Sequence, residues 1–315
     1  MATFGFRLQF WTSRAQLIET KNEAIVLKLR ETEKTIKLFP VSKDSNNICY
    51  NLIIQGSRYV SEDEASKEGE RIKNCILLSG LTLRMGFDIG KDKPILQFAK
   101  PLKDEYKDKF GVQIIDDVHG LIVYSEDMPV TTISANINAL VSVPINNFIN
   151  VFIEYYKNDY IISERYSLAL ELYNMSHFDK SLRGRFLTLV TVIESLSVRE
   201  ERSEASMKHL EELIGITKES DLETNDKESL IKGLDDLRKE SISRSCRKLV
   251  KRHLGQEGVK QFQRYYDVRG RILHNGAPPD EVNLDIETQN LDIFVSDLLK
   301  ANICGNVGPL NKVKI

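Results

Sequence analysis

The chain has only four cysteines and five histidines among its 315 residues, and neither type is clustered. No Cys-x-x-Cys pair, His-Glu-x-x-His motif or group of carboxylates has the spacing of a metal site. The cysteines lie at positions 49, 75, 246 and 304, too far apart for a zinc knuckle. We therefore expect no metal, no cofactor and reduced thiols.

Other features that would identify common function classes are also missing. There is no glycine-rich nucleotide-binding loop and no nucleophile elbow of the type Gly-x-Ser-x-Gly. No apolar run approaches the length needed to span a bilayer. The first seven residues lack the basic region and apolar core of a signal peptide. We expect a cytoplasmic protein with no membrane partner.

The chain also lacks an excess of either charge, because its formal net charge is −2. A nucleic-acid-binding surface, if present, must therefore be local. With 41% hydrophobic and 29% charged residues the composition is that of a globular protein. A length of 315 residues suits two domains better than one core.

The first part of the sequence predicts a small domain of mixed strands and helices. Phe4, Phe6, Leu8 and Phe10 alternate with small or polar residues, as in a half-buried strand. The other expected elements are strands at 24–29, 35–39, 51–55 and 121–124, and a helix at 61–79 opened by acidic residues after Ser61. The segment 81–89 fits either a strand or an extension of that helix. We assign residues 1–133 to this domain.

From about Ser134 onward, nearly every segment has apolar residues at the three- and four-residue spacing of a helix. The strongest stripe runs from Leu182 to Leu196 and predicts a central helix. The other helices are expected at 145–156, 163–173, 207–214, 228–237, 241–253, 262–273 and 291–299. Residues 134–315 are therefore predicted to form an all-helical bundle, so the fold class is α+β.

One short segment, Tyr265 to Gly276, combines a fixed cation with a titratable imidazole. It reads as the last turns of a helix that ends at Asn275-Gly276, before Pro278-Pro279. Arg269 could hold a phosphate in a bidentate grip, and His274 could move a proton. This pairing suits phosphodiester chemistry. The alternative is structural, because a histidine near a helix C-terminus is commonly a cap.

Two further features could support such chemistry. On the predicted helix from Ser241, four cations share one face: Arg244, Arg247, Lys248 and Lys251. These side chains could follow a phosphate backbone, but an ordinary solvated helix face is equally consistent with the pattern. Glu194 lies in the apolar central helix, where a bundle could bring it to Arg269 or His274. Arg271, within the motif itself, is a further candidate for RNA binding.

The helical half resembles HEPN domains, and more narrowly the Apea-like group of that superfamily, over residues 145–300. Residues 185–196, with their Glu-x-Leu ending, are similar to the group's central helix. Tyr266 to Gly276 is similar to the Arg-x4–6-His motif of the family, here with four intervening residues. The resemblance leaves the N-terminal domain without an assigned role.

The resemblance implies a metal-independent endoribonuclease that acts as a homodimer, in which two motif helices form one composite cleft. His274 would act as general base or acid, and Arg269 would stabilise the scissile phosphate. The attacking group would be the 2′-hydroxyl of the RNA. Many relatives act in bacterial toxin–antitoxin or phage-defence systems, which implies an antitoxin or activator partner and a sensing role for the N-terminal domain.

The motif departs from the family pattern at one position. The residue after the arginine is usually polar in active members, but here it is Gly270, and Asn275 is the candidate for supplying the missing polar group. Some HEPN domains are dimerisation or ligand-binding modules without nuclease activity. A nuclease requires accessible Arg269 and His274 in a cleft, with a second copy facing them and a basic rim. A module would bury Arg269 in an ion pair, for which Glu194 is a candidate partner, and would leave His274 exposed alone. A nucleotide-binding sensor is a third option.

Overall fold

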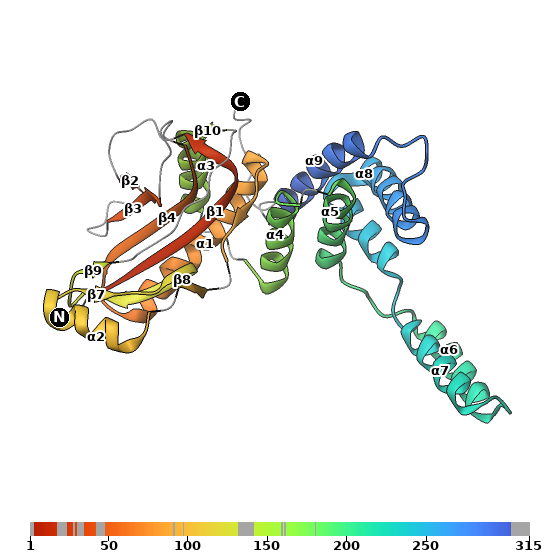
Figure 1. The fold of residues 1–315 in the computed structure, drawn as a ribbon. Coiled ribbons are helices and arrows are strands. Elements are labelled where there is room, and N and C mark those ends of the chain that lie inside the picture. The colour runs from red at the N-terminus through yellow and green to blue at the C-terminus, as the bar shows by residue number, and fades with distance from the viewer. Residues whose placement is uncertain are drawn as a thin grey trace. The chain divides into compact units, whose positions relative to one another are not determined.

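The computed structural model describes residues 3–17, 24–27, 29, 35–41, 48–90, 92–96, 98–131, 142–158, 160, 162–179 and 181–303. An antiparallel sheet near the N-terminus is followed mostly by helices, so the predicted α+β class is confirmed. The chain forms two compact units (Figure 1). The first contains the described residues up to Arg185 together with Ile303, and the second is Phe186–Asn302.

The main sheet of the first unit has the strand order β2-β3-β4-β1-β8-β6, and these neighbours are antiparallel. In that order the strands are β2 (Ile25–Leu27), β3 (Ile36–Pro40), β4 (Ile48–Tyr59), β1 (Phe4–Leu17), β8 (Asp117–Ser125) and β6 (Lys93–Leu96). The sequence had placed a strand within each of these except β6. The described residues also form the shorter strands β5 (Phe87–Asp88), β7 (Gln113–Ile114), β9 (Val130–Thr131) and β10 (Ser142–Pro144).

The core of the first unit lies between this sheet and helix α1 (Glu62–Leu83). Phe6, Leu8 and Phe10 are fully buried, as their alternation predicted. Ser61 caps α1 by accepting a hydrogen bond from the backbone N–H of Glu64. The ambiguous segment 81–89 divides at Arg84, which has a φ of 51° and ends the helix before β5 begins.

An ion pair is buried in the sheet of this unit. The guanidinium of Arg7 on β1 lies 3.1 Å from a carboxylate oxygen of Asp117 on β8, and both side chains are almost fully buried. The same nitrogen of Arg7 donates to the side-chain oxygen of Gln9 at 2.6 Å. Burial lowers the pKa of Arg7, and the neighbouring Asp117 carboxylate opposes that effect.

The boundary between the compact units differs from the predicted one at residues 133 and 134. Helices α3 (Ile145–Asn158) and α4 (Glu164–Ser176) were expected in the helical bundle, but they belong to the first unit. Phe148 on α3 packs against Phe10 and Phe87 of the sheet. The side chain of Asn174 on α4 accepts a hydrogen bond from the backbone of Phe87. These long-range contacts, rather than the change to helices, set the boundary.

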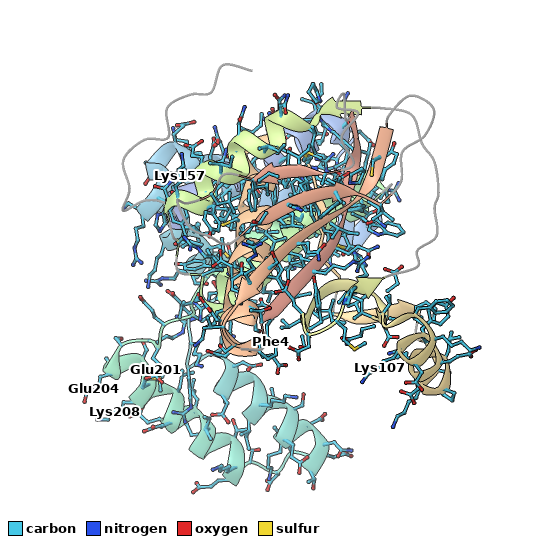
Figure 2. The ribbon with its side chains drawn as sticks, turned by 90° about the vertical axis from the view of Figure 1, so that its left-hand side faces the viewer. Phe4, Lys107, Lys157, Glu201, Glu204 and Lys208 are labelled. Atoms are coloured by element: carbon cyan, nitrogen blue, oxygen red, sulfur yellow. The ribbon has the colours of Figure 1, made fainter. Side chains whose placement is uncertain are left out.

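Helix α2 (Lys100–Phe110) was not anticipated from the sequence. Proline occupies its first turn and Gly111 ends it in the left-handed conformation, so its local signals are present. Its apolar residues Leu102, Tyr106 and Phe110 recur at four-residue spacing, so the sequence also held a short helical stripe that was overlooked. None of the residues of this helix is buried. Figure 2 shows the side chain of Lys107 on this helix. Helices α1 and α3 lie beside the sheet (Figure 1).

The second unit is all-helical, as expected. Its helices are α5 (Leu182–Leu196, which begins in the first unit), α6 (Glu204–Glu219), α7 (Thr224–Asp236), α8 (Ile242–Asn275) and α9 (Leu284–Ile303). Helix α5 has the predicted bounds, α6, α7 and α9 are longer than predicted, and α8 covers the two helices predicted at 241–253 and 262–273. Gly255 has φ 71° and ψ −167°, so α8 consists of two helical segments joined at a kink. Among the described helices, none is both long enough and apolar enough to cross a membrane.

Candidate active site

The motif segment forms the end of α8, and the helix ends as the sequence indicated. Gly276 adopts the left-handed conformation with φ 74°, and its backbone N–H donates to the carbonyl of Ile272. Val268 and Ile272 are buried and hold this helix against the unit. Arg269 and His274 are thereby fixed on a helix whose position is set by apolar packing.

Arg269 and His274 do not share one face of this helix. A separation of five residues corresponds to about 140° around a helix of 100° per residue. His274 is exposed, and no hydrogen bond or ion pair joins it to any described residue. The side chain of Arg269 retains 29% of its exposure and is turned towards the helical interior. Within a single chain, the two candidate catalytic groups therefore point in different directions.

Glu194 on α5 is the anionic partner of Arg269. A terminal guanidinium nitrogen of Arg269 lies 3.2 Å and 3.4 Å from the two carboxylate oxygens. The Glu194 side chain is 16% exposed, so solvent screens this pair only in part. The expectation that Glu194 reaches the motif is confirmed for Arg269. The same contact is the one expected of a non-catalytic module.

Tyr266 also contacts this pair, and sequence reasoning did not assign it a role. The guanidinium carbon of Arg269 lies 5.3 Å from the centre of the Tyr266 ring, within the range of a cation–π contact. Burial and the nearby Glu194 carboxylate raise the pKa of the Tyr266 hydroxyl. A tyrosine three residues before the arginine was the available signal, because residues at that spacing are neighbours on a helix.

A buried thiol lies close to these charges. Cys246, on the first segment of α8, is fully buried, with its sulfur 4.0 Å from the carbonyl oxygen of Ile193. Burial, together with the Glu194 carboxylate, raises the pKa of Cys246 to about 11. A protonated thiol of this kind is a poor nucleophile, so we assign Cys246 to packing rather than chemistry.

The predicted basic face on α8 is only partly available for RNA. Glu240, whose side chain is 5% exposed, accepts ion pairs from Arg244 at 3.3 Å and from Lys248 at 2.8 Å. Burial acts to raise the pKa of Glu240, but hydrogen bonds from Lys248 and from the Glu200 backbone lower it below its usual value. Arg244 and Lys248 therefore compensate the charge of the buried Glu240 carboxylate. Glu240 had not been identified as their partner from the sequence.

Among the described residues, no acidic side chain pairs with the other candidate RNA-binding cations. Arg247 donates to the carbonyl of Ser243 at 3.4 Å, one turn earlier on its own helix. Lys251, Arg271 and Asn275 are exposed, and none forms an ion pair with a described residue. Asn275 makes no hydrogen bond with Arg269 or His274. In the described parts of the chain, no three His, Cys, Asp or Glu side chains form a group that could hold a metal ion.

No protein-family model matches the chain, and neither curated proteins nor solved structures include one with significant similarity to it.

Proposed function

We propose that this protein is a metal-independent endoribonuclease of the HEPN type, with Arg269 and His274 as its catalytic residues. The observation that carries the proposal is the position of Arg269. Glu194 and Tyr266 hold it in one orientation while 29% of its side chain stays exposed, on the helix that also carries the exposed His274. Each copy of the chain thus supplies a pre-oriented guanidinium and an accessible imidazole, the two groups that phosphodiester cleavage needs.

In the proposed reaction the 2′-hydroxyl of the RNA attacks the adjacent phosphorus, and the bond to the 5′-oxygen breaks. An imidazole takes the proton of the 2′-hydroxyl or returns one to the leaving oxygen. The guanidinium stabilises the charge that develops on the phosphate oxygens. The products are a 2′,3′-cyclic phosphate and a 5′-hydroxyl. DNA is not a substrate, because it lacks the 2′-hydroxyl that attacks the phosphorus.

We infer that the active form is a homodimer. Because Arg269 and His274 point about 140° apart on one helix, a single chain does not direct both groups at one phosphate. Two motif helices packed together would bring Arg269 of one copy near His274 of the other. Lys251 and Arg271 remain as cations for the RNA backbone.

The biological setting that we propose is a bacterial defence or toxin system, in which an antitoxin or activator partner controls the nuclease. The first unit, with its sheet and its packed helices α1 and α3, is then the candidate sensor. This part of the proposal rests on the resemblance of the motif segments to the HEPN family.

A second candidate function has one specific observation in its favour. The ion pair between Arg269 and Glu194 satisfies the guanidinium within the chain, as expected for a non-catalytic interaction module. In that case Arg269 stabilises the contact between α5 and α8, and His274 is an ordinary exposed residue.

RNA cleavage in the presence of EDTA separates the two candidates. We expect His274→Ala and Arg269→Ala each to lower the cleavage rate at least about 100-fold, the range of general acid–base catalysis. His209→Ala is the matched control, because this histidine on α6 is also exposed. Cleavage by His274→Ala at the wild-type rate would exclude the assignment. A folded wild-type dimer that neither binds nor cleaves RNA would favour the module.

A further inference from the structure

The hairpin formed by α6 and α7 has little core of its own. The two helices pack on each other, but only Leu210 and Ile214 of α6 are buried between them. None of the residues of α7, all of which the structure describes, is buried. Short helices owe most of their stability to the burial of an apolar face, so a hairpin with so little burial is incompletely covered.

The ends of this hairpin are nevertheless firmly anchored. Arg199 donates to the carbonyl of Glu240 at 2.7 Å, and Arg202 donates to the carbonyl of Leu237 at 2.6 Å. Glu201 and Lys239 form an antiparallel bridge between the two connecting segments. The hairpin therefore begins and ends in a fixed junction, although its surface lacks a partner within the described chain.

An apolar stripe on α7 is exposed. Leu230 and Leu237 are 50% and 47% exposed, and residues at this spacing of seven lie on the same side of a helix. Gly233 lies between them, and a side chain added there would meet nothing within 4 Å. Two leucines around a small residue leave room for the side chain of another helix to insert. We call Leu230, Gly233 and Leu237 the α7 stripe.

The hairpin is also strongly acidic. Residues 204–236 contain ten acidic and four basic residues, which gives a formal net charge of −6. The whole chain carries only −2, so the negative charge is concentrated here. Asp226 lies one turn before Leu230 on α7, and Glu223 is the N-cap residue immediately before this helix. In Figure 2 the side chains of Glu204 and Lys208 point away from α6 at the start of the hairpin.

This charge decides which partners fit the stripe. RNA and anionic lipid surfaces are repelled by a region of −6. A second copy of the hairpin brings the same charge, so self-pairing of two stripes is disfavoured. A helix with leucine-like residues on one side and lysine or arginine beside them complements both the apolar stripe and the acidic flanks.

We propose that the α6–α7 hairpin is a docking surface for a cationic amphipathic helix of a partner protein, which binds along the α7 stripe. The partner inserts apolar side chains around Gly233 and places its cations near Glu223 and Asp226. This interaction is independent of the proposed nuclease chemistry, because none of its residues belongs to the motif on α8.

Fluorescence anisotropy with defined peptides tests the proposal on the full chain. The probe is a labelled peptide helix with leucines in a heptad pattern and lysines at the flanking positions, and the control peptide carries glutamates instead. We expect saturable binding of the lysine peptide only, with affinity that falls as salt increases. The double variant Leu230→Ser/Leu237→Ser should bind at least about tenfold more weakly, because two apolar contacts are lost.

Two further variants make the outcome specific. Ile286→Ser/Ile293→Ser is the matched control, because these exposed residues on α9 have the same spacing of seven, and it should bind as the wild type does. Glu223→Gln/Asp226→Asn should reduce both the affinity and its salt dependence. Equal binding by the stripe variant, or equal binding of the glutamate peptide, would overturn the proposal. A wild-type dimer that the Leu230→Ser/Leu237→Ser variant abolishes would identify a second copy as the occupant and would also overturn it.

Discussion

Arg7 and Asp117 illustrate how a buried charge constrains this protein at the level of single residues. The two side chains are 110 positions apart in the sequence, yet they form an ion pair in the interior of the sheet. Removing one member of such a pair leaves the other charge buried without compensation, which is far more costly than losing an exposed pair.

We therefore expect Asp117→Ala to lower the free energy of unfolding of the first unit by about 3–5 kcal/mol. Trp11, the only tryptophan in the chain, lies on β1, so its fluorescence during urea unfolding reports on this unit. Asp63→Ala is the control, because its pair with Lys67 is exposed and should contribute at most about 1 kcal/mol. A transition of Asp117→Ala that coincides with that of the control would contradict this account.

The buried thiol of Cys246 leads to a prediction about pH. With a pKa of about 11 in the folded protein, roughly one thiol in a thousand is ionised at pH 8, against about a quarter of ordinary cysteines. Iodoacetamide at pH 8 should therefore modify Cys246 at least about 100-fold more slowly in the native protein than in urea. Peptide mapping by mass spectrometry measures both rates. Rapid native modification would show that the thiol is accessible and ionised.

The same shift affects stability, and its sign follows from proton binding. Between the ordinary cysteine value of about 8.5 and the folded value of about 11, the folded state retains the Cys246 proton and the unfolded state loses it. The stabilisation due to this thiol is thus fully present below about pH 8.5 and is lost as the pH rises towards 11. Cys246→Ala should remove this part of the pH dependence.

At the scale of elements, two glycines of α8 should respond in opposite ways to substitution by alanine. Gly270 lies inside the helix, and an added side chain would meet nothing within 4 Å. Gly276 is equally unobstructed but has φ 74°, which a residue with a side chain rarely adopts. The contrast separates helix propensity from backbone strain, because packing is the same in both cases.

We expect Gly270→Ala to stabilise the helical unit by about 1 kcal/mol, which is the propensity difference between glycine and alanine. Gly276→Ala should destabilise it by about 1–2 kcal/mol, because the left-handed conformation becomes strained. Urea unfolding followed by far-UV circular dichroism gives both values. A loss of stability in Gly270→Ala would mean that the site is crowded by a second copy in solution.

At the scale of the whole molecule, the proposed shared site can be tested by mixing two inactive variants. Arg269→Ala retains His274, and His274→Ala retains Arg269. A mixed dimer then contains one intact composite site and one site that lacks both groups. Random exchange yields half mixed dimers, so the mixture should recover about a quarter of the wild-type activity in a symmetric dimer.

The control for this experiment is a mixture of either variant with Arg269→Ala/His274→Ala, which cannot form an intact site. Mass spectrometry of chains with different tags confirms that subunits have exchanged. Confirmed exchange without recovery of cleavage would show that each site, if it exists, is built within one chain.

The amino-acid sequence by itself determined the local elements of this protein. The alternation of Phe6, Leu8 and Phe10 specified a strand, and the stripe from Leu182 to Leu196 specified a buried helix. The left-handed end of α8 at Gly276 was also evident from local residues. Such features depend on the periodicity and backbone preferences of neighbouring residues, which a single sequence records directly.

Only the tertiary structure decided which distant residues meet. It assigned α3 and α4 to the unit of the sheet, where Phe148 contacts Phe10 and Phe87. It confirmed one of two possible partners for Glu194, which lies 75 positions before Arg269. It also showed that Glu240 forms ion pairs with Arg244 and Lys248, two cations that the sequence had suggested as RNA contacts. The sequence shows which side chains are charged. Whether such a charge can bind a ligand depends on its burial and on the partners that folding brings to it.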